Sequence, residues 1–337
     1  MLTPDMLSLI QYALAPAQRV LCISHVGPDG DAIGSLVGMG WILHALGKEP
    51  TLALQDPLPD GFDEMPGAAK IIHAEQVAAT YDLIVCLDSS SPDRMGRIFR
   101  PDDHDAIPMV VVDHHVTNTN FGDVNWVEPR CAATCQMLVY LAQELNVPLT
   151  GPLAECLLTG IVTDTLCFRT SNTDADVLAA ATLLIQGGAD LAAITARTLN
   201  RRRFTTLKLL AIVLADTQLV QRVIWTTISR AQLAETGNES GEDMQLNSML
   251  IATREADISA TFTEKLADDG TPAVECSFRA KPGFDVSKLA YELGGGGHPP
   301  ASGCTLPGSL DQVVARVVPL LQEAQSRQAI GQTGAPV

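Results

Sequence analysis

Short apolar runs that alternate with helical segments constrain the first half of this chain more than any other feature of its sequence. Runs rich in Val, Ile and Leu are typical of parallel strands that are covered on both faces. Such runs occur at residues 19–25, 50–55, 82–90 and 107–115. Helical patterns follow at residues 32–47, 133–145 and 153–165. The alternation predicts a doubly wound α/β domain with a mainly parallel sheet, in which ligands bind beyond the carboxyl ends of the strands.

Strand-like patterns replace a continuously helical one near residue 217, and this change predicts a second domain. A length of 337 residues suits two domains. We expect a first domain at residues 1–189, a helical linker at 190–216 and a smaller α+β domain at 217–326, with a cleft between the domains. The last stretch, 327–337, has no periodicity and is expected to be a flexible tail.

The net charge of −17 argues against a long basic groove for duplex or extended single-stranded nucleic acid. A small anionic substrate is compatible with this charge, because bound metals and a few basic side chains offset local acidity. The eight cysteines contain no Cys-x-x-Cys pair, which favours buried thiols in a reducing cytosol. With no basic leader and no bilayer-length apolar stretch, we expect a soluble cytoplasmic protein without a membrane partner.

A cluster of ionisable residues follows the first predicted strand. His25 ends that strand, and Asp29 and Asp31 come next in a turn that opens a helix. Two carboxylates and an imidazole at this spacing can hold a divalent ion. The alternative, which this cluster alone leaves open, is that both aspartates are turn and helix-cap residues and His25 is incidental.

Three further acidic positions repeat the pattern. Asp88 follows an apolar strand, Asp113, His114 and His115 end the next one, and Asp164 lies near the end of an apolar helix. Each has a plain structural alternative as a cap or a polar strand end, but strand ends are where this fold binds ligands. Mixed Asp/His ligation favours Mn²⁺, Mg²⁺ or Fe²⁺ over a structural zinc. So many carboxylates predict two metals with a bridging ligand, a common device for phosphoester hydrolysis.

A glycine run in the second domain precedes His298. It consists of Gly294, Gly295, Gly296 and Gly297. Its backbone can approach a ligand closely and present N–H groups to an anion. Arg279 and Lys281 lie nearby, two residues apart on one face of a predicted strand. The combination favours phosphate recognition over the alternative of a flexible loop beside a charged edge strand. The role of Arg169 stays open, and residues 201–203 favour a solvated helix face.

Five segments, taken in order, resemble known motifs. They are SHVGPDGDAIGS, VCLDSS, VVDHH, GIVTDT and GGGGHPPASG. In this order they resemble the signature motifs of the DHH phosphoesterase family, the last belonging to its DHH-associated C-terminal domain. The resemblance covers nearly the whole chain. Its length and lack of added domains look like the branch of nanoRNases and phosphoadenosine-phosphate phosphatases, whose members also hydrolyse linear and, in some cases, cyclic dinucleotides.

The resemblance implies two Mn²⁺ ions in the first domain, with Mg²⁺ or another divalent metal as a substitute. The implied ligands are His25 and Asp29 for one ion, Asp31, His114 and Asp164 for the other, and Asp88 as the bridge. Asp113 and His115 would be the catalytic pair, with His115 near the substrate phosphate. Arg279, His298 and the glycine backbone would bind the other end of the substrate. The resemblance also implies a homodimer.

These residues predict metal-assisted hydrolysis, in which a hydroxide bridging two metals attacks phosphorus in line. The expected substrates are short oligonucleotides, linear dinucleotides such as pApA, and 3'-phosphoadenosine 5'-phosphate, with the second domain setting a length limit. Three alternatives stay open: a cyclic dinucleotide phosphodiesterase, a RecJ-like single-strand exonuclease and a non-catalytic nucleotide sensor. A manganese pyrophosphatase would share the first-domain motifs but not the glycine run.

Overall fold

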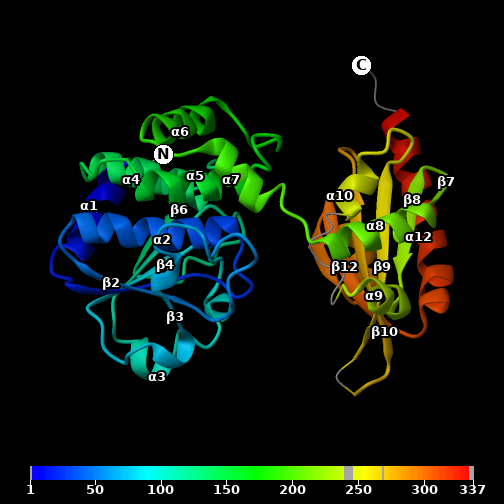
Figure 1. Cartoon of the computed structure of the whole chain (residues 1–337), viewed down its shortest axis with the longest axis horizontal. Coiled ribbons are helices and arrows are strands. Elements are labelled where there is room, and N and C mark those ends of the chain that lie inside the picture. Colours follow the sequence, from blue (N-terminus) through cyan, green and yellow to red (C-terminus); the bar gives the residue numbers. More distant parts are fainter. Residues whose placement is uncertain (1, 239–245, 268, 334–337) are drawn as a thin grey trace. The chain divides into compact units, whose positions relative to one another are not determined.

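The chain divides between Arg201 and Arg202 into two domains, each with its own hydrophobic core. The structure is a computed structural model that describes residues 2–238, 246–267 and 269–333. Each domain contains one sheet with helices against it (Figure 1).

A parallel sheet forms the middle of the first domain, as the apolar runs predicted. Its strands are β1 (Arg19–Ile23), β2 (Glu49–Leu54), β3 (Ile71–His73), β4 (Leu83–Leu87), β5 (Met109–Asp113) and β6 (Val124–Val127). They pair in the order β3-β2-β1-β4-β5-β6, and every pairing is parallel. The order reverses between β1 and β4, and such a switch point is where doubly wound sheets bind their ligands.

Helices and short turns cover both faces of this sheet. The helices are α1 (Pro4–Leu14), α2 (Gly30–Ala45), α3 (Pro101–His104), α4 (Thr134–Glu144), α5 (Pro152–Asp164), α6 (Ala175–Gln186) and α7 (Leu191–Thr198). Short 3₁₀ helices lie at Ala68–Lys70, Ala74–Gln76 and Pro92–Met95. Successive residues of β1 point to opposite faces, so Cys22 joins the core under α2, α4 and α5 while Ile23 joins the core on the side of α3. The alternation explains why these strands read as continuous apolar runs.

Glycines allow α2 and α5 to pack closely. A Cβ at Gly34 would lie 2.7 Å from the carbonyl oxygen of Cys156, and one at Gly30 would lie 2.2 Å from Oγ1 of Thr163. Larger residues at these positions would push the helices apart. The contact at Thr163 brings the first turn of α2 next to the last turn of α5, where Asp164 lies.

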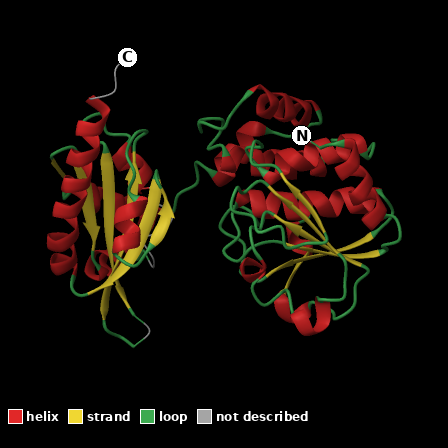
Figure 2. Cartoon of the chain, turned by 180° about the vertical axis from the view of Figure 1, so that it is seen from behind, coloured by secondary structure: helices red, strands yellow, loops and turns green. Residues whose placement is uncertain are grey.

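The second domain is built on a mixed sheet, and the predicted α+β class is confirmed. Its strands are β7 (Gln218–Val220), β8 (Val223–Ile228), β9 (Ile258–Leu266), β10 (Pro272–Ala280), β11 (Gly296–His298) and β12 (Ala301–Pro307), in the order β11-β12-β10-β9-β8-β7. Its helices are α8 (Phe204–Ala215), α9 (Arg230–Thr236), α10 (Leu246–Ile251), α11 (Ser287–Glu292) and α12 (Leu310–Thr333). All pairings are antiparallel except that of β8 with β9. Figure 2 shows α12 lying along this sheet.

Two predicted segments differ from the structure. The expected linker at 190–216 is not one continuous helix, because it breaks at residues 199–203 and its halves serve different cores. Ile194 of α7 packs in the first domain, and Val213 of α8 packs in the second. The tail expected at 327–337 is wrong for residues 327–333, which are the last turns of α12. Gln328 exchanges hydrogen bonds with the backbone of Asp285, which holds this end of the helix in place. Residues 334–337 lie outside the described residues.

Among the described residues, no single helix has the length and apolar composition needed to cross a membrane. The bent pair α6 and α7, at 108° to each other, meets that test of length and composition only when the two are taken together.

Candidate metal centre and active site

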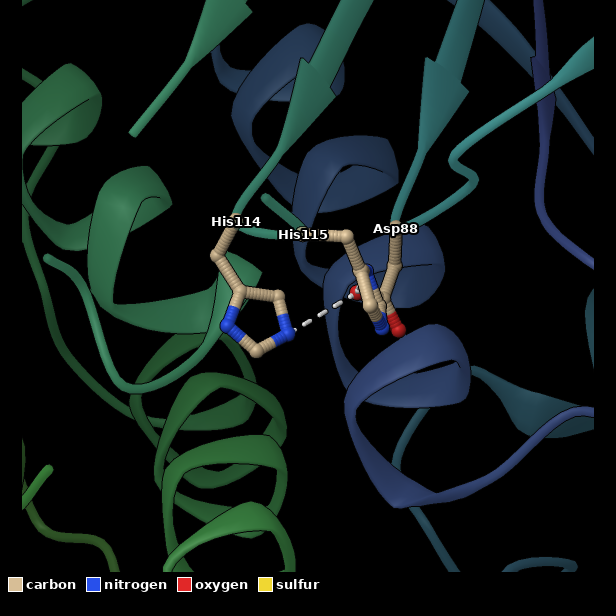
Figure 3. Close-up of side chains that lie close together, drawn as sticks. All are labelled: Asp88, His114 and His115. Carbon is tan, nitrogen blue, oxygen red and sulfur yellow. Dashed lines mark ion pairs between the residues drawn. The ribbon is translucent and has the colours of Figure 1, made fainter. Parts of the chain in front are cut away.

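Side chains from three neighbouring strand ends meet at the switch point of the first sheet. His25 follows β1, Asp88 follows β4, and His114 and His115 follow β5. Figure 3 shows the ring of His114 turned toward the Asp88 carboxylate, with His115 close by. The site therefore occupies the place where this sheet topology binds ligands.

The first ligand group consists of His25, Asp29 and Asp88, which offer donor atoms within 4.8 Å of one another. Nε2 of His25 lies 3.6 Å from Oδ2 of Asp88 and 3.9 Å from Oδ1 of Asp29. Nδ1 of His25 lies 2.9 Å from the carbonyl oxygen of Val26. This contact assigns the hydrogen to Nδ1 and leaves the Nε2 lone pair for the group. Asp29 is also the N-cap of α2, so its capping role and its place in the group coexist.

The second ligand group consists of Asp31, His114 and Asp164, whose donor atoms also lie within 4.8 Å of one another. Nε2 of His114 lies 3.9 Å from Oδ2 of Asp31 and 3.5 Å from Oδ2 of Asp164. The same Nε2 lies 3.5 Å from Oδ1 of Asp88. Oδ2 of Asp88 therefore faces the first ligand group, and Oδ1 faces the second.

Burial and repulsion make the carboxylates of the second group hard to ionise. Burial, with the negative charges of Asp88 and Asp164, raises the pKa of Asp31 well above its usual value. Burial and the charges of Asp88 and Asp29 raise the pKa of Asp164 to about 8. Positive charge on His115 and His25 offsets only part of this crowding at Asp164, and a cation between the carboxylates would offset more of it.

Asp88 has a different environment because histidines surround it. Burial acts to raise its pKa, but the adjacent His25, together with His114 and His115 nearby, outweighs burial and lowers the pKa. Its backbone has a φ of 56°, in the left-handed region that residues other than glycine seldom adopt. Strain of this kind is often kept at functional sites.

The donor set fits divalent cations. Both groups offer carboxylate oxygens and an imidazole nitrogen, which suit Mn²⁺, Mg²⁺ or Fe²⁺. The crowded, buried carboxylates described above would be stabilised by such an ion. The residues therefore fit the metals that the sequence predicted, with each group able to hold one ion.

Asp113 and His115 form a hydrogen-bonded pair beside the ligand groups. Oδ1 of the fully buried Asp113 lies 2.8 Å from Nδ1 of His115. This hydrogen bond is the main cause that raises the pKa of His115 to about 9, against the opposing effect of burial. The sequence analysis missed Asn118, whose Nδ2 donates to Oδ2 of Asp113 at 2.6 Å and to the carbonyl oxygen of Ser89 at 3.1 Å.

The first turn of α4 was also missed. The backbone N–H groups of Thr134 and Cys135 donate to the two carboxylate oxygens of Asp31, at 2.6 and 2.9 Å. The hydroxyl of Thr134 donates to Oδ1 of Asp88 at 3.0 Å. The start of a predicted helix after β6 was the signal available, but it did not indicate which carboxylates the helix would contact.

A second strained segment follows Asp164. Leu166, Cys167 and Phe168 have φ values of 48°, 59° and 63°, so three successive non-glycine residues are left-handed. The N–H of Cys167 donates to the carbonyl oxygen of Val162 at 2.7 Å and holds this turn against the end of α5. Arg169, whose Nε donates to the carbonyl oxygen of Leu166, is exposed on the same turn.

Two of the predicted substrate residues of the second domain lie on the strands that flank β12. Arg279 of β10 and His298 of β11 both pair with Ala301 of β12, so the three residues form one row across the sheet. Directly paired residues point to the same face of a sheet, so Arg279 and His298 lie on one face, with their strands about 10 Å apart. Arg279 is half-buried, and its Nη1 donates to the carbonyl oxygen of Phe278 at 2.9 Å. A hollow of about 430 Å³ is lined in part by Arg279 and Ala301.

The glycine run is part of an edge strand rather than a free loop. A Cβ at Gly297, whose φ is 130°, would lie 2.6 Å from Cα of Ser302, and one at Gly295 would lie 2.1 Å from the carbonyl oxygen of Gly303. Glycine is therefore required for β11 to approach β12. Lys281 lies just after β10, where its Nζ donates to the carbonyl oxygen of Thr253 at 2.7 Å. This hydrogen bond gives Lys281 a structural role. Arg201, from the basic run at 201–203, forms an ion pair with Glu64, in which Nη1 and Oε1 lie 3.0 Å apart.

Comparisons with known proteins agree with this architecture and with the motif order. Residues 19–161 match the DHH family, N-terminal domain, and residues 222–325 match the DHHA1 domain. The chain is 36% identical to the bifunctional oligoribonuclease and PAP phosphatase NrnA of Thermus thermophilus, over 90% of this chain and 89% of that protein. It is 26% identical to the protein of the same name from Bacillus subtilis, over 89% and 93% of the two chains. The fold is similar to that of an exopolyphosphatase-related protein from Bacteroides fragilis, with a TM-score of 0.87, 21% identity and 96% coverage of each chain. The chain belongs to the DHH phosphoesterase family and is a hydrolase of phosphoester bonds.

Proposed function

We propose that this enzyme hydrolyses short oligonucleotides, including linear dinucleotides, and 3'-phosphoadenosine 5'-phosphate in the cytoplasm, with two Mn²⁺ ions as cofactors. The observation that supports the two-ion site most strongly is the position of Asp88 between the ligand groups, with Oδ2 near His25 and Oδ1 near His114. The substrate class rests on the relatives named as oligoribonucleases and PAP phosphatases.

In this proposal each ligand group holds one ion. The ligands are His25 and Asp29 for the first ion, Asp31, His114 and Asp164 for the second, and Asp88 for both. When bound, two divalent cations supply an activated water nucleophile and positive charge beside the phosphate oxygens. Mg²⁺ or another divalent metal would fit the same donors.

His115 is the residue that we propose holds a proton near the reacting phosphate. The hydrogen bond with Asp113 raises the pKa of His115, which favours a proton on the ring. Since Nδ1 is bound to Asp113, the Nε2–H remains for a phosphate oxygen or the leaving group. Asp113 fixes the orientation of the ring, as the carboxylate of a catalytic His–Asp pair does.

The second domain is proposed to bind the far end of the substrate. Arg279 supplies a half-buried guanidinium, which suits a phosphate, and His298 lies in the same row of the sheet. The outer edge of β11 carries backbone N–H groups from the glycine run, since β11 pairs only with β12 among the described strands. Binding both ends of a substrate sets a length limit, and the net charge of −17 disfavours longer polymers.

The metal centre is tested by the variants Asp88→Ala and His114→Ala, assayed with Mn²⁺ and a dinucleotide. Both should lose at least about 100-fold in kcat/KM, because each removes a ligand atom. Asp102→Ala, which removes an exposed carboxylate of α3, is the matched control and should retain wild-type activity. Wild-type activity in both site variants would contradict the assignment.

The substrate class is tested by comparing kcat/KM for a dinucleotide, a 5-mer, a 20-mer, phosphoadenosine phosphate and a cyclic dinucleotide. We expect the dinucleotide and phosphoadenosine phosphate to be the better substrates. A preference for the 20-mer would indicate a processive exonuclease, and tight nucleotide binding without turnover would indicate a sensor. The homodimer stays a prediction, which light scattering of the purified chain would check.

A further inference from the structure

Thr134 contacts two carboxylates that come from distant parts of the first domain. It is the first residue of α4 and is fully buried. Its backbone N–H donates to Oδ2 of Asp31 at 2.6 Å, and its hydroxyl donates to Oδ1 of Asp88 at 3.0 Å. The main chain of this residue thus binds one member of the second ligand group, and its side chain binds the carboxylate that faces both groups.

The orientation of the Asp88 carboxylate plane decides whether one oxygen faces each group. Oδ2 lies 3.6 Å from Nε2 of His25, whereas Oδ1 lies 3.5 Å from Nε2 of His114. The terminal torsion of an aspartate is broad and gives little preference for one orientation. The hydroxyl of Thr134 contacts only Oδ1. It therefore selects the rotation in which each oxygen is directed to its own group.

The hydroxyl is not needed to cap α4. Asp31 accepts the N–H groups of Thr134 and Cys135, so a carboxylate from α2 satisfies the first turn of this helix. The residue before Thr134, Ala133, gives no side-chain cap. The contact of the hydroxyl with Asp88 is thus separate from the start of the helix, and the two can be altered independently.

We propose that Thr134 is a positioning residue of the metal centre, whose hydroxyl holds Asp88 so that one oxygen is directed to each ligand group. The proposal rests on the two-ion function above and adds to it a residue that is not itself a ligand. Residues that orient metal ligands typically change metal affinity or activity by about 10–100-fold when they are replaced.

The test is a calorimetric titration of the metal-free full-length chain with Mn²⁺ alone. Thr134→Val keeps the shape of the side chain and removes the hydroxyl, and Thr134→Ser keeps the hydroxyl. We expect the valine variant to bind Mn²⁺ about 10–100-fold more weakly than wild type. The serine variant should stay within about 3-fold of wild type, since it retains the donor. Equal affinity of the valine variant and wild type, or equal losses in both variants, would overturn the proposal.

Thermal unfolding without metal separates positioning from a purely structural role. A valine variant that unfolds at a lower temperature but binds Mn²⁺ like wild type would show that the hydroxyl only supports the fold. If this variant does not fold, Thr134→Ala takes its place and should show the same loss of affinity. Failure of the wild-type chain to bind Mn²⁺ would instead contradict the two-ion function itself, so the two failures are distinguishable.

Discussion

Asp113 is a buried carboxylate whose two oxygens are both bound by its own loop. The ring and backbone of His115 bind Oδ1, and Asn118 binds Oδ2. A buried charge held in this way has one orientation, and so does the imidazole that it binds. At the scale of single residues, the geometry of His115 therefore depends on a side chain that is fully buried.

Replacing Asp113 by Asn should lower kcat on a dinucleotide by about 10–100-fold, because His115 loses its charged partner. The pKa of His115 in the metal-free chain should fall from about 9, since the hydrogen bond to Asp113 is the largest cause that raises it. NMR titration of the ring protons measures this shift. Asp123→Asn, which alters a carboxylate bound to the N–H of Met109 at the other end of β5, is the control. An unchanged pKa of His115 would contradict the prediction.

The sequence allowed the ligand types of the site to be predicted, but not the residues that hold them. His25 and Asp88 follow recognisable strands, so their neighbourhood follows from the fold. Thr134 contacts Asp88 across 46 positions of sequence and Asp31 across 103. Local patterns do not contain such contacts, because they depend on how α4 packs against two other elements.

At the scale of elements, the packing of α2 against α5 sets the spacing of the second ligand group. A Cβ at Gly34 would meet a backbone oxygen, whereas the nearest atom to a Cβ at Gly38 would be Cδ2 of the Leu157 side chain, at 2.6 Å. The first neighbour cannot move without shifting α5, and the second can change its rotamer. The same helix face therefore offers a rigid contact and an adaptable one.

Gly34→Ala should destabilise the first domain by about 1–3 kcal/mol, because the added methyl group meets backbone atoms. Gly38→Ala should change the free energy of unfolding by less than about 1 kcal/mol, because the helical preference of alanine offsets the movement of Leu157. Urea unfolding of both variants measures the difference. Equal effects at the two positions would show that the helices separate more easily than the structure implies.

The glycine run gives a second prediction at this scale, on the hairpin of β11 and β12. Gly297→Ala should loosen the hairpin by about 1–3 kcal/mol, because its φ of 130° and the contact with Ser302 both exclude a side chain. A Cβ at Gly296 would meet nothing within 4 Å, so Gly296→Ala should leave the hairpin intact. Hydrogen exchange of the β12 amides distinguishes the two. The sequence did not predict the pairing of β11 with β12, because a glycine run carries no local signal for a strand.

At the scale of the whole molecule, the two cores are separate and should respond separately to mutation. Asp257 lies before β9 and accepts two hydrogen bonds from Arg222 and one from Gln325. All three residues belong to the second domain. The division of the chain into two domains was predictable from the change from helical to strand-like patterns, but the position of the boundary was not. The stretch at 190–216 is helical on both sides of its break, and only packing shows which half joins which core.

Asp257→Asn should destabilise the second domain by about 1–2 kcal/mol at pH 7, a modest value because Arg222 is half exposed to screening water. The hydrogen bond with Arg222 holds the pKa of Asp257 below its usual range. Its stabilisation is therefore complete above the unfolded pKa of about 3.9 and is lost as the pH falls through the lower folded-state value. The difference between variant and wild type should shrink over that range.

Hydrogen exchange resolved by segment measures this effect in the full chain. Amides of β9 should lose protection in the variant at pH 7, while those of β4 in the first domain should not change. Equal loss of protection in both sheets would show that the domains unfold as one unit.

The placement of Asp88 between the two ligand groups limits how this enzyme can change during evolution. A change at Asp29 removes a donor from the first group and a change at Asp164 removes one from the second, so each leaves the donors of the other group in place. A change at Asp88 affects both groups in one step. A substitution at position 88 is therefore the single change that would most directly remove metal binding while it leaves the fold in place.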